Sequence, residues 1–147
     1  MDSREGQMTD EQFTVVELTK DQVADVQERL EHYDFDRFPL PMRGAVRVGI
    51  EVDGKLVAGV DAEMTSFRIL YVSSLYVDEP FRRQGLGRRL MELVEERAKG
   101  LGANLIRLDT FDWQGPDFYK SLGYEQVGHY SAPEDGFEEH FFLKRLG

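Results

Sequence analysis

The stretch RRQGLGRRL, residues 82–90, decides how this chain folds. It follows an apolar segment, ILYVSSLYV at residues 69–77, which is typical of a central strand. It opens a segment whose apolar residues fall on one stripe, and this predicts an amphipathic helix from about Gly85 to Leu101. Another strand is expected at Asn104–Asp109. Strand, helix and strand together predict one parallel crossover inside a sheet.

Four arginines lie within this stretch of an acidic chain. Arg88 and Arg89 fall in the first turn of the predicted helix, where the macrodipole disfavours positive charge. Free N–H groups at a helix start, with glycines that allow close approach, form a phosphate site. We therefore interpret the stretch as an anion-binding loop; a turn with a solvated basic edge is the alternative. A Walker loop is excluded because GxxxxGK[ST] is missing, and a Rossmann fingerprint because the third glycine is absent.

The rest of the chain predicts mostly antiparallel strands. A first strand is expected at 13–18 and a helix from Thr19 or Asp21 to about Leu30, then a short helix or ordered loop at 32–44. Strands at 46–52 and 56–60 are joined by an Asp53-Gly54 hairpin turn. Two more strands, at 124–130 and 138–146, follow a short helix that begins at Pro116. The expected fold class is α/β (α+β), with about seven strands and about four helices.

Length and composition limit the class of protein. The 147 residues are most simply one domain, 1–147, with residues 1–10 as a flexible leader. No stretch is apolar enough to span a bilayer, and the polar N-terminus lacks the apolar core of a signal peptide, so we expect a cytoplasmic protein without a membrane partner. The absence of cysteine and the scattered histidines argue against a metal site. The net charge of -10 disfavours a nucleic-acid partner and would attract a cationic one.

Two motifs together resemble the GNAT family of N-acetyltransferases. The family signature Q/R-x-x-G-x-G/A, placed after a central strand, is matched by residues 82–87 (RRQGLG). A second signature, FYxxxGF, is similar to residues 118–124 (FYKSLGY). The order and spacing of both motifs agree, and the resemblance runs from about Val46 to the C-terminus. It implies a GNAT-like fold, in which the central strands of a mixed sheet splay apart.

The resemblance also implies direct acetyl transfer from acetyl-CoA to a primary amine, without a metal and without an acyl-enzyme. Backbone groups at the end of the central strand would pair with the pantetheine arm, and the glycine loop would hold the diphosphate. The cofactor-binding residues implied in this way are Leu75, Tyr76, Val77, Arg82, Arg83, Gln84, Gly85, Leu86, Gly87 and Arg88. Asp112 stands where the family often has an asparagine that contacts the cofactor.

Tyr119 matches the tyrosine that protonates the leaving sulfur in many family members. A phenol with a pKa of ~10 stays protonated at neutral pH, so it can donate a hydrogen bond or a proton to a thiolate. The alternative for Tyr119 is a packing aromatic beside Phe118.

The general base is less clearly marked. The central-strand positions hold Ser73 and Ser74, which cannot act as bases alone. Glu63 is our first candidate, and Asp61 on the same strand face and Asp109 are the other carboxylates. An acceptor amine that arrives neutral would need no base.

The acceptor is expected to be a small-molecule amine. Residues 32–38 and 130–140 are rich in aromatic and acidic side chains, which suit a cation. Trp113 either lines the acceptor pocket or plugs the sheet. The alternatives are a protein amine as acceptor, a non-catalytic sensor of CoA or another nucleotide, and an interaction domain without a ligand. A homodimer is compatible with the resemblance.

Overall fold

A computed structural model of the chain describes residues 12–37 and 43–147. These residues fall into two compact units, divided between residues 39 and 40. The first unit holds helix α1 (Lys20–Asp34) and a short 3-10 turn, η3 (Phe35–Arg37). Helix α1 begins with a capping box, in which Thr19 Oγ1 accepts from the Gln22 N–H at 3.2 Å and Gln22 Oε1 accepts from the Thr19 N–H at 2.9 Å. Of the two caps predicted, Thr19 and Asp21, the structure has Thr19.

The strand expected at residues 13–18 does not form. Residues 13–19 carry no regular secondary structure, and Val15 and Val16 are exposed. A strand needs a neighbour for its N–H and C=O groups, and the first unit offers none within residues 12–37. Of the element expected at 32–44, the structure shows the end of α1 and η3, and residues 38–42 lie outside the described residues. The leader at 1–10 also lies outside them, and the single domain 1–147 stays a prediction.

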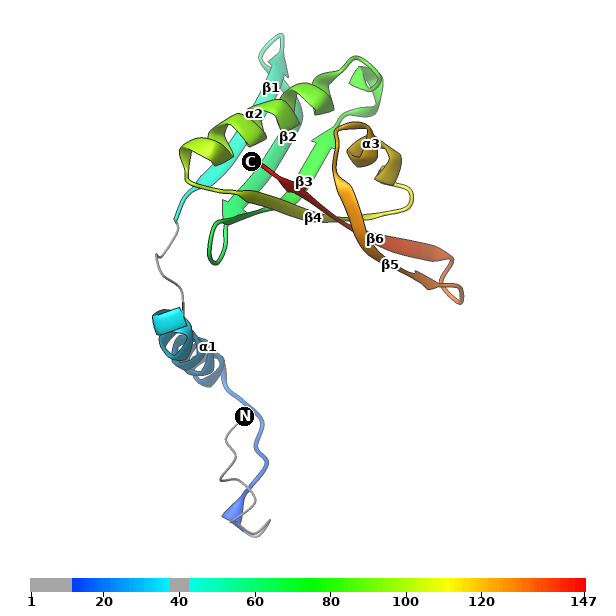
Figure 1. Ribbon diagram of the computed structural model, residues 1–147. Coiled ribbons are helices and arrows are strands. Elements are labelled where there is room, and N and C mark those ends of the chain that lie inside the picture. Colours follow the sequence, from blue (N-terminus) through cyan, green and yellow to red (C-terminus); the bar gives the residue numbers. More distant parts are fainter. Residues whose placement is uncertain (1–11, 38–42) are drawn as a thin grey trace. The chain divides into compact units, whose positions relative to one another are not determined.

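The second unit is built on a six-stranded sheet in the order β1-β2-β3-β4-β6-β5 (Figure 1). Strands β3 and β4 are parallel, and every other neighbouring pair is antiparallel. This confirms the mixed, mostly antiparallel sheet with one parallel crossover, although the described residues hold six strands and three α-helices. The strands are β1 (Ala45–Val52), β2 (Lys55–Met64), β3 (Ile69–Val77), β4 (Leu105–Phe111), β5 (Glu125–Ala132) and β6 (Phe137–Arg145).

The hairpin between β1 and β2 has the predicted turn. Asp53 and Gly54 both have positive φ, 52° and 77°, and Val52 pairs with Lys55 across them. Two central residues with positive φ match the right-handed twist of the flanking strands, which is why Asp-Gly is favoured there.

Helix α2 (Leu86–Gly100) crosses one face of this sheet (Figure 1) and supplies Leu90, Met91, Val94 and Ala98 to the core. Helix α3 (Pro116–Ser121) lies on the same face, because Tyr119 packs against the buried ring of Phe142. Along each strand, the residues between the buried ones point to the opposite face of the sheet, and many of them are polar.

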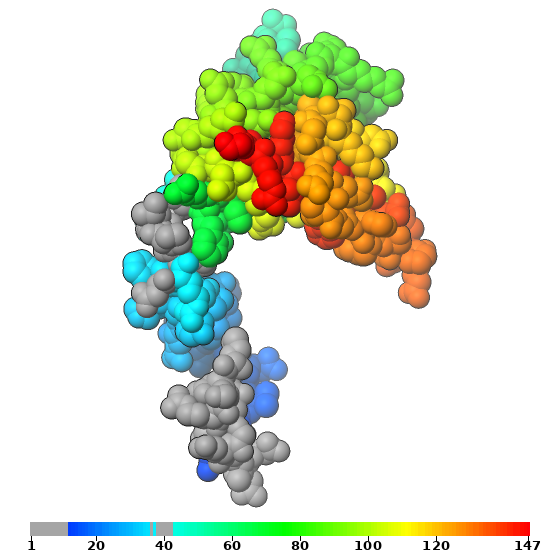
Figure 2. Space-filling model, viewed as in Figure 1, coloured from blue at the N-terminus to red at the C-terminus, as the bar shows by residue number. Residues whose placement is uncertain are grey.

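The end of β6 packs between α2 and the segment around β5, which Figure 2 shows on the surface. Lys144 Nζ lies 2.7 Å from Glu95 Oε1 of α2 and donates to Leu122 O at 2.8 Å. These contacts fix the short helix α3 and its tyrosine against α2. Across the described ranges, no helix is both long and apolar enough to cross a membrane.

Candidate active site

The parallel strands β3 and β4 pair only along their first residues and then separate. Their register runs from Ile69↔Leu105 to Val72↔Leu108, although β3 continues to Val77 and β4 to Phe111. A bulge in β3 begins the separation, since Ala62 of β2 pairs with Val72 but Asp61 pairs with Ser74, leaving Ser73 as the extra residue. The splayed central strands expected from the resemblance are thus present, and an opening begins just beyond Val72 and Leu108.

One edge of β3 presents free backbone groups to this opening. Asp78 N donates to Val57 O of β2 at 2.8 Å, and residues two apart on a strand direct their backbone groups to the same side. The groups of Tyr76 therefore face β2, whereas those of Leu75 and Val77 face the opening, where Val77 O already accepts from Arg82 Nε at 2.8 Å. An extended molecule with amide groups can add to such an edge as a further strand.

The loop after β3 passes through a 3-10 turn, η4 (Glu79–Phe81), and enters α2 at Gly85. Gly85 has φ 80° and caps the helix without a side-chain hydrogen bond. The first intrahelical bond is Arg89 N to Gly85 O at 3.0 Å, so the N–H groups of Leu86, Gly87 and Arg88 have no partner within the helix. Together with the positive end of the helix dipole, free N–H groups of this kind are suited to bind an anion.

The arginines of the loop divide into two groups. Arg82 ties the loop to β3, because its Nε donates to Val77 O at 2.8 Å and its guanidinium lies 5.4 Å from the Tyr76 ring centroid. Arg83, Arg88 and Arg89 are exposed, and no carboxylate of residues 12–37 or 43–147 forms an ion pair with them. These three side chains are therefore available to a bound anion.

Tyr119 has a buried ring on α3. The residue is 8% exposed, and its ring packs against Phe118, Tyr124 and Phe142, with ring centroids 5.1, 5.8 and 6.0 Å away. Burial raises the pKa of Tyr119 to about 12. The phenol is therefore protonated at neutral pH, and its ring position is fixed by packing on three sides.

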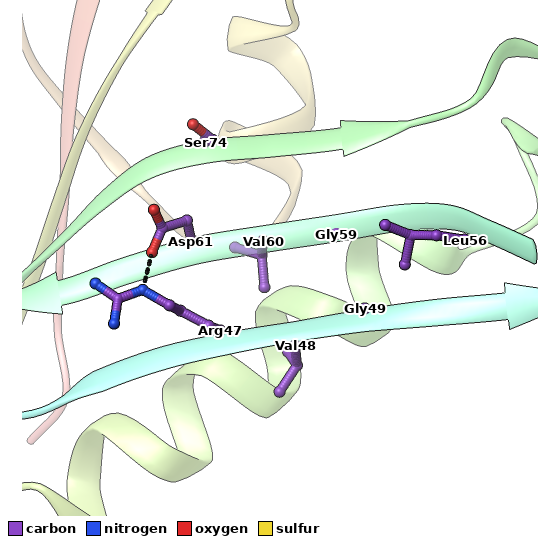
Figure 3. A pocket seen from close by; sticks show the side chains of 8 residues that line it. All are labelled: Arg47, Val48, Gly49, Leu56, Gly59, Val60, Asp61 and Ser74. Atoms are coloured by element: carbon purple, nitrogen blue, oxygen red, sulfur yellow. Dashed lines mark hydrogen bonds and ion pairs between the residues drawn. The ribbon is translucent and has the colours of Figure 1, made fainter.

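The carboxylates Asp61 and Glu63 share one arginine of the neighbouring strand. Asp61 Oδ1 lies 2.9 Å from Arg47 Nε, and Glu63 Oε2 lies 3.5 Å from Arg47 Nη2. Asp61 points away from α2, as does Ser74, whereas Val48 and Val60 point toward the helix (Figure 3). A shallow hollow of about 310 Å³ lies here; it is lined by Arg47, Val48, Gly49, Leu56, Gly59, Val60, Asp61 and Ser74.

Asp109 occupies a different place, as the first residue of β4 beyond the last β3–β4 pair. It is half-buried on the face opposite α2, and its Oδ2 accepts from the Tyr71 hydroxyl at 2.9 Å. Sequence reasoning missed Tyr71. Its position on the central strand could have indicated it. Tyr71 pairs with Glu63 across β2 and β3, so both side chains lie on the same face of the sheet.

Trp113 is exposed rather than buried in the sheet, with a relative exposure of 68%. Its ring stacks on Phe111 at a centroid distance of 4.8 Å, and Phe137 meets both rings edge-on. No group of three or more His, Asp or Glu residues in the described ranges is placed to hold a metal ion.

A model of the acetyltransferase (GNAT) family matches residues 11–124 of this chain. The chain belongs to the GNAT family of acetyltransferases. A blasticidin-S acetyltransferase of Streptomyces morookaense is 32% identical over 94 residues, which are 63% of this chain and 68% of that protein. The crystal structure of an acetyltransferase from Bacillus cereus superposes with a TM-score of 0.84 at 31% identity, covering 92% of this chain and 99% of that one.

A more distant structural neighbour, an aminoglycoside 6'-N-acetyltransferase complexed with coenzyme A, shares the fold at 17% identity. Its TM-score is 0.62, and the match covers 92% of this chain and 98% of that one. The protein is an acetyl-CoA dependent acyltransferase.

Proposed function

We propose that this GNAT acetyltransferase transfers the acetyl group of acetyl-CoA directly to a primary amine of a small molecule in the cytoplasm. One observation carries the proposal: the free edge of β3 runs from the β3–β4 opening to the anion site at the start of α2. A linear cofactor with a diphosphate at one end and amide groups along its arm matches that arrangement. Relatives named for blasticidin-S and aminoglycosides support a small-molecule acceptor.

The cofactor would be held in two parts. Its pantetheine arm would pair with the backbone of Leu75 and with the N–H of Val77, while the side chain of Tyr76, which is 59% exposed, would flank the arm. Its diphosphate would bind the first N–H groups of α2, with exposed arginines as counter-charges. The residues proposed for the diphosphate are Arg82, Arg83, Gln84, Gly85, Leu86, Gly87 and Arg88.

The reaction itself needs no covalent intermediate on the protein. The amine nitrogen attacks the thioester carbon, and the tetrahedral intermediate then expels the sulfur as a thiolate while the nitrogen loses a proton. Tyr119 is proposed to meet that sulfur. A thiol has a pKa of ~8.5, so full proton transfer from a phenol with a pKa of about 12 would be uphill by on the order of 5 kcal/mol. Tyr119 therefore acts as a hydrogen-bond donor to the developing thiolate rather than as its proton source.

The proton of the amine would leave on the other face of the sheet. Tyr119 belongs to the face that carries α2, whereas Glu63 belongs to the opposite face and is solvent-exposed. Glu63 is proposed to take the proton through water, and Asp61 beside the same arginine is the alternative. The ion pairs with Arg47 hold both carboxylates on this face of the sheet.

The test is a panel of primary amines incubated with acetyl-CoA while free thiol is followed. Thiol release and a mass increase of one acetyl group on a small amine are expected. Acetylation of peptide amines alone would assign a protein acceptor instead. If no amine consumes acetyl-CoA while CoA still raises the melting temperature, the proposed transfer is overturned. Sedimentation of the same sample measures whether the enzyme is a homodimer, which stays a prediction.

A further inference from the structure

We propose that Asp109 contacts the ammonium group of a cationic acceptor and that Tyr71 positions its carboxylate. This inference rests on the proposed function and names the class of its acceptor: a small molecule whose reacting amine arrives charged, or carries a second cationic group beside it. Asp109 is then a substrate-contacting residue, and Tyr71 is a positioning residue behind it.

The place of Asp109 in the sheet is the first argument. Leu108 is the last β4 residue that pairs with β3, so Asp109 stands where the two strands begin to part. The side chain of Asp109 points to the face opposite α2, since the residues of β4 that alternate with it are buried in the core. These buried residues are Ile106, Leu108 and Thr110. A thioester lying in the opening would thus have Asp109 on the face of the sheet opposite α2.

The charge balance of the carboxylates is the second argument. Asp61 and Glu63 both form ion pairs with Arg47. Within the described ranges, Asp109 has no ion pair, and its side chain accepts from a neutral phenol at 2.9 Å. A half-buried carboxylate without a counter-ion gains the most from an incoming cation, since its charge is only partly solvated.

The side chains that the structure describes around Asp109 hold its carboxylate in place without forming an ion pair with it. Arg107 lies over the Tyr71 ring at 4.4 Å from the centroid instead of pairing with the carboxylate. Glu139 faces the same region and accepts a hydrogen bond from the Tyr130 hydroxyl. Burial first, and the hydrogen bond to Asp109 second, raise the pKa of Tyr71, so its hydroxyl remains a donor to Asp109 in alkaline solution. An ionised carboxylate accepts about four hydrogen bonds, so one phenol leaves room for an ammonium group.

The experiment measures steady-state kinetics of the whole enzyme with an acceptor found in the amine panel. Asp109→Asn keeps the shape and an oxygen acceptor for Tyr71 but removes the charge, so the KM for the amine is expected to rise on the order of 10- to 100-fold. The KM for acetyl-CoA is expected to stay unchanged. Tyr71→Phe is expected to raise the amine KM by a smaller factor, and Asp109→Glu to restore part of the loss.

Asp53→Asn is the matched control, because it removes the same charge at a turn whose positive φ asparagine tolerates. It is expected to leave both KM values unchanged. An unchanged amine KM in Asp109→Asn, or a fall in kcat alone, overturns the inference while the proposed function stands. If Asp109→Asn fails to fold, Tyr71→Phe decides: an unchanged amine KM in that variant overturns the inference as well. Absence of transfer by the wild-type enzyme is the separate outcome that removes the proposed function.

Discussion

Gly87 lies against the ring of Phe118, and a Cβ atom on Gly87 would stand 3.2 Å from Phe118 Cζ. Gly87 belongs to the first turn of α2, and Phe118 belongs to α3, directly before Tyr119. The glycine loop and the FY motif are therefore two sides of one contact. The absence of a side chain at Gly87 lets Phe118 of α3 approach the first turn of α2, and Tyr119 follows Phe118 on the same short helix.

We expect Gly87→Ala to push Phe118 away and to move α3. Overpacking of this kind costs about 1–3 kcal/mol, and we expect kcat to fall because Tyr119 moves with the helix. Gly85→Ala is the contrasting change. A Cβ there has no atom within 4 Å, but φ is +80°, so its cost is backbone strain of about 1–2 kcal/mol. Urea unfolding and kcat of both variants test this. Equal losses of kcat in Gly87→Ala and Gly85→Ala would contradict the expected effect of the Gly87–Phe118 contact on kcat.

Arg88→Gln tests whether the exposed arginines serve an anion. Arg88 is in the first turn of α2, where a cation opposes the helix dipole, so the free protein should gain about 0.3–1 kcal/mol of stability when the charge is removed. The KM for acetyl-CoA should rise at the same time. Arg97→Gln is the matched control in the last turn of the same helix, where a cation is favourable. It should slightly destabilise the protein and leave the KM for acetyl-CoA unchanged. Melting temperature and KM are measured for both variants, and an unchanged KM in Arg88→Gln would contradict the prediction.

The core of this fold could be predicted from the sequence because its signals are local. The separate elements β3, α2 and β4, the Asp53-Gly54 turn and the Thr19 cap each depend on residues close together in the sequence. The strand at 13–18 was wrong for the opposite reason. Alternating apolar residues show that a segment can be a strand, but a strand exists only where another supplies its hydrogen bonds.

The candidate site could be predicted only in part. The residues of the glycine loop are contiguous in the sequence, so the spacing of the motif was enough to predict them. Which carboxylate stands free depends on cross-strand register, since Arg47 reaches Asp61 and Glu63 from β1 while Tyr71 reaches Asp109 from β3. The register of β1 on β2 and of β3 on β4 joins residues far apart in the sequence, and the alternation of apolar residues within one strand does not indicate it.

Tyr119→Phe tests the proposed hydrogen bond to the leaving sulfur. Loss of one donor to a developing anion costs on the order of 100- to 1000-fold in kcat, and we expect the lower end because the high pKa makes this phenol a weak donor. The KM for acetyl-CoA should change little. Tyr124→Phe is the matched control: its ring is also buried beside α3, but its hydroxyl faces Glu95 at 3.5 Å. A kcat that is equal in Tyr119→Phe and in wild type would leave Tyr119 a packing residue.

The same two phenols predict how stability depends on alkaline pH. Burial raises the pKa of Tyr119 to about 12 in the folded state, and burial and Glu95 raise the pKa of Tyr124 further, whereas both lie near ~10 in the unfolded chain. Between these values the unfolded chain has lost protons that the folded protein keeps, so the free energy of unfolding must fall as pH rises above about 10. Below about pH 10 neither group contributes a slope. Urea unfolding from about pH 8 to about pH 11.5 measures this, and Tyr119→Phe should flatten the decline without removing it, because Tyr124 still titrates. A slope of the variant as steep as that of the wild type would show that Tyr119 is not shielded from water in the folded protein.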